Sequence, residues 1–204
     1  MFGLKSLKAI ALAGALALMA GGAQAVTIDF ERITNNSPID GSSQLEASAS
    51  DNGASVYIAF VVLVGAQGGA NIADIYFSDL LGLFTPAPVY VTHSGTVEFE
   101  FGGNNSPPSL PGANEANPDF VTTAGLVAEA SGNNATGITV GESLTLALTF
   151  AAGFDFADFL AALESGDFRI GLHVRSLEGG ASDSFVSSSV PSAVPIPAAG
   201  FLLL

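Results

Sequence analysis

The sequence contains no cysteine and no tryptophan, and only five of its 204 residues are lysine or arginine. Without cysteine the chain forms no disulfide and no thiolate metal site, and it cannot be acylated in the manner of bacterial lipoproteins. The lack of tryptophan removes the usual aromatic platform of a sugar-cleaving cleft. The scarcity of basic residues argues against nucleic acid and anionic membranes as partners.

Acidic residues are common by contrast, with 19 Asp and Glu and a net charge of −14. Lys5 and Lys8 are the only lysines, so the part after residue 25 carries three arginines against all 19 acidic residues, a formal charge of −16. The apolar fraction of 49% is too high for a disordered acidic tail. This composition is typical of exported β-proteins, and residues 26–186 are long enough for one domain.

The first 25 residues are typical of a signal peptide. Lys5 and Lys8 give a positive start, and the apolar stretch 9–20 that follows is shorter than the ~20 residues a membrane span needs. An A-x-A sequence then precedes the predicted cleavage point. The residues of this cleavage site are Ala23, Ala25 and Val26. We expect export by the Sec machinery, the alternative being a short anchor or a core helix.

The other end of the chain carries a second signal-like segment after a Ser-rich linker at 187–193. Two prolines disrupt local structure, small residues leave the backbone accessible, and a leucine run begins. The segment consists of Val194, Pro195, Ile196, Pro197, Ala198, Ala199 and Gly200, followed by residues 201–204. It resembles the PEP-CTERM sorting signal of Gram-negative bacteria, in its VPLPA-type variant.

The resemblance implies where the protein goes. In that family a transmembrane helix and an arginine-rich tail follow the motif, and an exosortase-type membrane protease is thought to recognise the whole signal. The chain ends at Leu204, so the resemblance implies a C-terminally truncated signal. It also implies a place at the cell surface, in the outer envelope or outside the cell, reached through a transient membrane segment. Three internal stretches resemble a group of such cargo proteins, which are linked to extracellular polysaccharide and biofilm matrix. They are 72–82, 106–112, and 168–175 with 182–185 after it.

Alternation of apolar and polar residues predicts a mainly β protein. Strands are expected at 26–31, 72–77, 96–101, 144–150 and 168–175, and around Phe185. The continuous apolar run 56–64 predicts a central strand covered on both faces. With no βαβ rhythm, the pattern favours an antiparallel, jelly-roll-like β-sandwich.

One helix is predicted near residues 155–165. Asp155 is a suitable N-cap, Asp158 lies in the favourable first turn, and Gly166 is a suitable C-terminal glycine. Apolar residues at helical spacing give it one buried face. They are Phe156, Phe159, Leu160 and Leu163.

The strand at 168–175 is expected to be half-buried, with Arg169, His173 and Arg175 on its outer, solvent-facing side. The glycine- and proline-rich stretch 102–118 is a long loop, and loops of that length are usually functional or mobile.

Residues that could carry chemistry are few. A zinc site needs three or four convergent ligands, and His93 and His173 are the only histidines, so surface hydrogen bonding is their expected role. No Gly-x-Ser-x-Gly elbow supports a serine nucleophile. Glu98 and Glu100 share one face of a strand, at a spacing of about 6.5–7 Å that a glycosidase could use, but the same pattern is typical of any solvated strand face.

Calcium is the favoured cofactor if one is bound, because hard cations take carboxylate and carbonyl oxygens. Asp74, Asp79, Asp119 and Asp183 are expected in or near turns, although no EF-hand loop or RTX-type repeat is present. A solvated acidic surface is the alternative.

Three hypotheses follow. We expect a non-catalytic exported protein of the cell surface or matrix, with no catalytic residues. The second hypothesis is a carbohydrate-binding sandwich, with or without calcium, which an exposed tyrosine beside the 102–118 loop would favour. The tyrosines are Tyr57, Tyr76 and Tyr90. The third is a hydrolase of the glycosidase type, which would need a cleft around its carboxylates or histidines.

Overall fold

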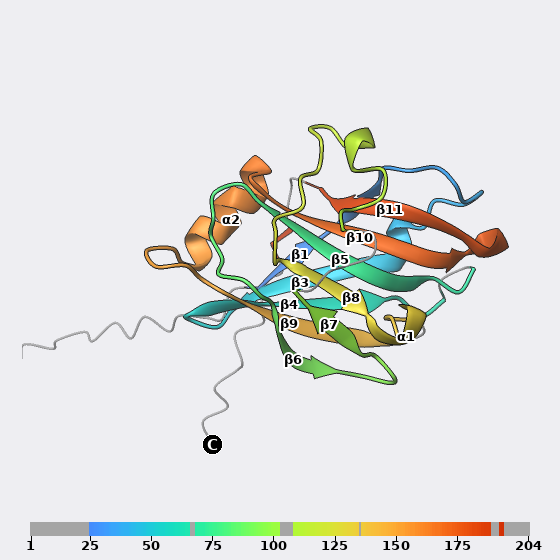
Figure 1. The fold of residues 1–204 in the computed structure, drawn as a ribbon, viewed down its shortest axis with the longest axis horizontal. Helices are drawn as coiled ribbons and strands as arrows, with labels where there is room; N and C mark the ends of the chain where they lie inside the picture. The colour runs from blue at the N-terminus through green and yellow to red at the C-terminus, as the bar shows by residue number, and fades with distance from the viewer. Residues whose placement is uncertain (1–24, 66–67, 103–107, 135, 189–191, 194–204) are drawn as a thin grey trace, which may run out of the picture.

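The computed structural model describes residues 25–65, 68–102, 108–134, 136–188 and 192–193, which form two six-stranded sheets packed face to face (Figure 1). All pairings between the named strands are antiparallel. The predicted antiparallel β-sandwich is therefore confirmed.

Sheet A contains, in spatial order, β12 (Ser192–Ala193), β1 (Ala25–Ile28), β3 (Leu45–Asp51), β4 (Ser55–Val62), β9 (Ser143–Thr149) and β6 (Val89–His93). Sheet B contains β2 (Phe30–Arg32), β11 (Ala181–Ser187), β10 (Phe168–Leu177), β5 (Asn71–Asp79), β8 (Val127–Ala130) and β7 (Phe99–Phe101). The helices are α1 (Ser131–Asn134) and α2 (Phe156–Ser165), with 3-10 turns η1 (Ser42–Gln44), η2 (Ala113–Glu115) and η3 (Glu178–Gly180).

The first expected strand belongs to both sheets. β1 pairs with β3 in sheet A, and after Asp29 the chain continues as β2 beside β11 in sheet B. Val26, Ile28 and Phe30 are all buried, which is the alternation that predicted a half-buried strand. A single amphipathic segment thus ties the two layers together at this edge.

The core lies between the sheets. Leu144, Leu146 and Leu148 of β9 are fully buried on the inner face of sheet A, as their spacing predicted. From sheet B, Phe77 and Phe168 face them and stack on each other at a centroid distance of 6.0 Å. Aliphatic and aromatic residues from both sheets fill one continuous cluster.

Helix α2 closes one end of the sandwich (Figure 1). The Asp155 carboxylate accepts from the backbone N–H groups of Ala157 and Asp158, while the Asp158 carboxylate accepts from the Asp155 N–H, which makes a capping box. Gly166 ends the helix at φ 80°, in the left-handed region. Phe156, Phe159 and Leu163 are buried against the core, so the predicted helix is confirmed.

The outer face of sheet B is covered by the segment 108–122, which lies over β10, β5 and β11 (Figure 1). This segment and the sheet beneath it share a second apolar cluster, which we call the outer core. It consists of Tyr76, Leu110, Ala116, Phe120, Val127 and Val186, with Ile33 and Ala113 packed against it. The long loop is therefore a structural cover along this part of its length.

Two features hold the segment 108–122, which we call the cover, against the outer face of sheet B. Gly171 leaves room for it, because a Cβ there would lie 2.8 Å from Leu110 Cδ2 and 3.0 Å from Phe120 Cζ. Arg169 fastens it, since Nη1 donates to the Pro118 carbonyl at 2.7 Å and Nη2 donates to the Asp119 carbonyl. The same guanidinium carbon lies 5.4 Å from the centroid of the Phe120 ring.

Two sequence-based expectations about burial are wrong. β4 is central but is not covered on both faces, because Tyr57, Ala59 and Val61 are only partly buried on the open face of sheet A. β10 is not half-exposed, because Arg169 and His173 on its outer face are only 6% and 7% exposed. Among the described strands, β5 and β10 are buried on both faces along most of their length, and β11 is buried on both faces over residues 183–187.

The predicted signals lie largely outside the described residues. Ala23 and the whole segment 194–200 belong to that part of the sequence, whereas Ala25 and Val26 lie in β1. Of the expected linker, Ser187 ends β11, and Ser192 and Ala193 pair with β1 as β12. Among the described helices, none is both long and apolar enough to cross a bilayer.

Candidate functional site

The two histidines lie in different sheets and do not form a joint site. His93 is exposed on edge strand β6, where its ring meets Tyr90 edge-on at 5.2 Å, whereas His173 is buried in sheet B. Within the described residues, no group of three or more His, Cys, Asp or Glu side chains could hold a metal ion.

His173 forms a buried pair with Asp74, so its expected role in surface hydrogen bonding is wrong. Its Nδ1 lies 2.8 Å from Asp74 Oδ2, and the Asp74 side chain is fully buried. Arg175 Nη2 approaches the same carboxylate oxygen at 4.0 Å. The pair could not be predicted from the sequence because Asp74 and His173 are almost a hundred residues apart. Only the register of β5 and β10 brings the two side chains together.

Register also places Ser184 of β11 opposite His173, so Asp74, His173 and Ser184 lie in one row across three strands. These are the residue types of a nucleophilic triad. Ser184, however, is only 1% exposed, and its backbone N–H and carbonyl are bonded to Thr34 and Ile33. A substrate carbonyl has to reach the hydroxyl, and a serine that is 1% exposed does not offer it.

Three of the four carboxylates proposed for calcium, those of Asp74, Asp79 and Asp183, have other partners. Asp79 accepts from the backbone N–H groups of Leu83 and Phe84 at 2.9 and 3.0 Å, and so fixes the turn after β5. Asp119 is exposed, and its carbonyl accepts from Arg169. Asp74 pairs with His173, and Asp183 lies inside β11, so the expectation that all four lie in or near turns is wrong for these two strand residues.

Glu98 and Glu100 are exposed while Val97 and Phe99 are buried, as the alternation predicted. Glu100 lies opposite Glu129 of β8. Three cavities lined by described residues have volumes of about 350, 230 and 250 Å³, and neither Glu98, Glu100 nor either histidine lines them.

None of the three tyrosines is an exposed platform beside the cover. Tyr76 is fully buried in the outer core, where burial raises its pKa well above the ordinary value. Tyr90 donates its hydroxyl to the Val97 carbonyl at 2.8 Å, and partial burial raises its pKa. Tyr57 is partly buried on the outer face of β4.

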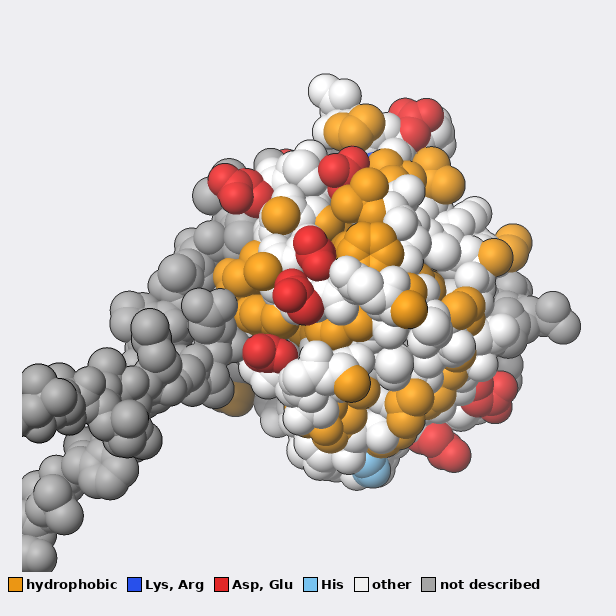
Figure 2. All heavy atoms as spheres, turned by 90° about the vertical axis from the view of Figure 1, so that its left-hand side faces the viewer, with side chains coloured by type: hydrophobic (Ala, Val, Ile, Leu, Met, Phe, Trp, Pro, Cys, Tyr) orange, Lys and Arg blue, Asp and Glu red, His pale blue; other side chains and the backbone are white. Residues whose placement is uncertain are grey.

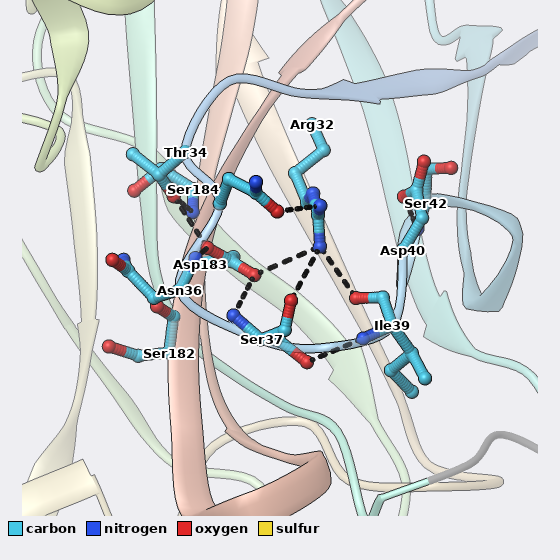
Figure 3. Close-up of polar contacts among 11 residues, drawn as sticks. Arg32, Thr34, Asn36, Ser37, Ile39, Asp40, Ser42, Ser182, Asp183 and Ser184 are labelled. Carbon is cyan, nitrogen blue, oxygen red and sulfur yellow. Dashed lines mark hydrogen bonds and ion pairs between the residues drawn. The ribbon is translucent and has the colours of Figure 1, made fainter.

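The most elaborate polar arrangement is at the loop 33–42, which joins β2 to η1 (Figure 3). Asp183 is 1% exposed and accepts from Thr34 Oγ1 at 2.9 Å and from the backbone N–H groups of Asn36 and Ser37 at 2.7 and 3.0 Å. A carboxylate with several donors can be buried at low cost. Asp183 therefore acts as the anchor around which this loop folds.

Arg32 holds the second half of the same loop (Figure 3). Its Nη1 donates to the carbonyls of Ile39 and Ser37 at 2.6 and 3.2 Å and lies 3.5 Å from Asp183 Oδ2, while Nη2 donates to Asn35 Oδ1. Asp40 then accepts from the Ser42 N–H at 2.9 Å. That bond lowers the pKa of Asp40 below its ordinary value, against the opposing effect of burial.

The loop held in this way forms one wall of two adjoining cavities, which we call the loop cleft. The larger, of about 350 Å³, is lined by Ile39, Asp40, Ser43, Gln44, Leu63, Val64 and Gly65. The smaller, of about 230 Å³, shares Ser43 and Leu63 and adds Asp29, Phe30, Ser42, Leu45 and Glu46. No sequence pattern predicts this cleft, because its walls come from separate turns.

Comparison with known proteins places the chain in no group: no protein-family model, curated protein or solved structure matches it.

Proposed function

We propose that the chain is an exported, non-catalytic protein of the cell surface or extracellular matrix, sorted through its PEP-CTERM-like motif by an exosortase-type protease. An export-signal pattern at one end of the sequence and the sorting motif at the other support this, with one β-sandwich between them.

The observation that carries the non-catalytic part of the proposal is the use of buried charges. The carboxylates of Asp79 and Asp183 each accept from two backbone N–H groups, and Nη1 and Nη2 of Arg169 donate to backbone carbonyls. A general acid, base or nucleophile must instead direct a reactive atom at its substrate. Asp79, Asp183 and Arg169 hold loops in place through these hydrogen bonds.

The negative surface charge supports the proposed extracellular location. Acidic side chains are distributed over the end of the sandwich that carries α2, with hydrophobic side chains between them (Figure 2). A strongly negative protein stays soluble and is repelled by anionic membranes and nucleic acid. Such a surface suits a protein dispersed in a matrix.

The test follows the full-length gene product in its native host, by intact mass and by cell fractionation. Residues 194–198 are replaced by a Gly-Ser stretch of equal length, and Ile196→Leu, which gives the VPLPA spelling, is the matched control. We expect cleavage near Pro195 and arrival at the surface in the parent and in the control, with both lost in the Gly-Ser variant. Unchanged mass and location in the Gly-Ser variant would overturn the proposal.

A further inference from the structure

The open face of sheet A carries almost no charge, although the chain has a net charge of −14. Side chains alternate between the two faces of a strand, so every second residue of β1, β3, β4, β9 and β6 belongs to this face, and strand register aligns these residues in rows. The middle row consists of Thr27, Ser48, Ala59, Thr145 and Thr92. Within these five described strands, Glu46 is the only charged residue that faces outward.

The open face is an even surface of small side chains. β4 lies near its middle and contributes Tyr57, Ala59 and Val61, all partly buried. The outward residues of the neighbouring strands β3 and β9 are serine, threonine or alanine, apart from Glu46. Of the three cavities described above, one reaches this face, at Glu46. Small-molecule sites are concave, so a face of this shape suits a broad and even partner surface.

Charge decides which partner can approach this face. The carboxylates lie on other surfaces, among them the end that carries α2 (Figure 2) and the outer face of sheet B, where Glu100 lies opposite Glu129. Two copies of so acidic a chain repel each other, and this repulsion is least where the facing surfaces carry no carboxylates. A polyanion is repelled by the whole chain, and a polycation finds one carboxylate on this face to pair with. A second open face, which is nearly uncharged as well, meets neither obstacle.

The size of the face fits a weak and reversible contact. Strands about 4.8 Å apart and outward rows about 6.8 Å apart give these five strands roughly 500 Å² of face per copy. A pair of copies would bury roughly 1,000 Å², which is at the low end for specific protein interfaces. The apolar part of this area is central, because Tyr57 and Val61 flank Ala59 along β4, and Val89, 55% exposed, adds an apolar edge.

We propose that the open face of sheet A is the contact surface between two copies of this chain, which pack sheet on sheet about a twofold axis near Ala59. A closed twofold contact uses the same surface in both copies, and an axis at this point sets β4 of one copy against β4 of the other. Tyr57 and Val61 then leave water together in the centre of the contact. Glu46 lies off the axis, on β3, so the two Glu46 carboxylates do not face each other. This inference goes beyond the proposed function, because self-association does not depend on where the chain is sorted.

The experiment is sedimentation velocity of the full chain at concentrations from about 1 µM to about 1 mM, in low and in high salt. We expect a monomer–dimer equilibrium with a Kd of about 10–500 µM. It should tighten as salt rises, because salt screens the repulsion between the two negative copies. A chain that stays monomeric at every concentration, an association that weakens as salt rises, or assemblies larger than a dimer would each overturn the proposal.

Two variants assign the association to the open face. Ala59→Asp and Thr145→Asp each add a carboxylate to its middle row, where the second copy brings the same carboxylate close by. Each is expected to weaken dimerisation at least tenfold, which corresponds to ~1.4 kcal/mol. Ala161→Asp makes the same change of net charge at an exposed position of α2 and should leave the Kd unchanged. Equal weakening in all three variants, or none in the two open-face variants, would overturn the assignment.

Thermal unfolding at about 1 µM, where the parent is expected to be monomeric, separates loss of the contact from loss of folding. Tyr57→Ser, which removes apolar area from the contact without adding a charge, is the third open-face variant and should also weaken dimerisation. Unchanged dimerisation in this variant would overturn the central place of β4. Titration with a neutral glucan hexamer tests the other occupant of such a face. Binding of the hexamer to a parent that stays monomeric would assign the face to a polysaccharide and overturn the proposal.

Discussion

Sheet A and sheet B contribute the same number of strands to one core, yet their outer faces differ. The outer side chains of β4 are partly exposed, whereas those of β5 and β10 are buried beneath the segment 108–122. Sheet A therefore faces water as an ordinary antiparallel sheet does, while sheet B behaves as the middle layer of three. The buried outer face of sheet B also contains the Asp74–His173 pair, although alternation marks this face of β10 as polar.

The largest expected effect comes from breaking the buried pair. Asp74→Ala leaves His173 Nδ1 buried without its 2.8 Å partner, so we expect a loss of about 3–5 kcal/mol in the free energy of unfolding. The matched change on sheet A, Glu46→Ala at an exposed position, should have little effect. Urea denaturation measures both. Similar losses in the two variants would contradict the contrast between the faces.

An apolar double variant separates the pair from the packing around it. Asp74→Leu with His173→Leu removes both polar groups together, and replacement of a buried pair by apolar residues is often neutral. We expect this double variant to be more stable than Asp74→Ala. A double variant with the same free energy of unfolding as Asp74→Ala would contradict this, because it would mean that the pair contributes more than the mutual hydrogen bonding of its two members.

The next effect concerns the cover. Phe120 is 4% exposed, packs over Gly171 and lies against Arg169, so Phe120→Ala should cost about 3 kcal/mol. It should also speed hydrogen exchange in β10 more than in β4. Val61→Ala, on the open face of sheet A, is expected to cost clearly less. Unchanged exchange in β10 would show that the cover does not protect sheet B.

A smaller effect comes from adding one methyl group at the point of closest approach. Gly171→Ala places a Cβ within 3.0 Å of Leu110 and Phe120, and such overpacking costs about 1–3 kcal/mol. Ala59→Val, on the outer face of β4, adds volume toward solvent and should be tolerated. Thermal unfolding of both variants compares the faces directly, and a tolerated Gly171→Ala would show that the cover shifts freely.

The smallest expected effect lies at the edge of sheet A. Glu142 accepts from Thr96 N–H, Thr139 N–H and Thr139 Oγ1 at 3.0, 3.0 and 2.7 Å. Burial raises its pKa, but these bonds outweigh burial and lower the pKa below 4.5. Because the folded pKa is lowered, the stabilisation is present above about pH 4.5 and is lost as the pH falls through the folded value.

Glu142→Gln should therefore reduce the free energy of unfolding at neutral pH by less than about 1 kcal/mol. It should also make the decrease of that free energy at acidic pH less steep. Urea unfolding at a series of pH values measures this, with Glu98→Gln as an exposed control. A parallel pH dependence in Glu142→Gln and the parent would contradict the assigned role.

Much of the fold was predictable because it depends on local patterns. The capping box of Asp155 and Asp158, the glycine end at Gly166 and the alternating leucines of β9 are set by neighbours in sequence, and all are confirmed. The candidate sites were not predictable in the same way. The Asp74–His173 pair depends on strand register, and the loop cleft depends on turns brought together by Asp183.

By itself the sequence determined that two sheets form and which side chains face the core, because period-two alternation and capping are short-range. It also contains the two terminal patterns from which export and sorting are proposed. Only the tertiary structure decided which strands are buried on both faces and where a cleft opens. Those outcomes depend on how a long loop packs on a distant strand, and that packing reflects contacts such as Phe120 on Gly171 that no local pattern contains.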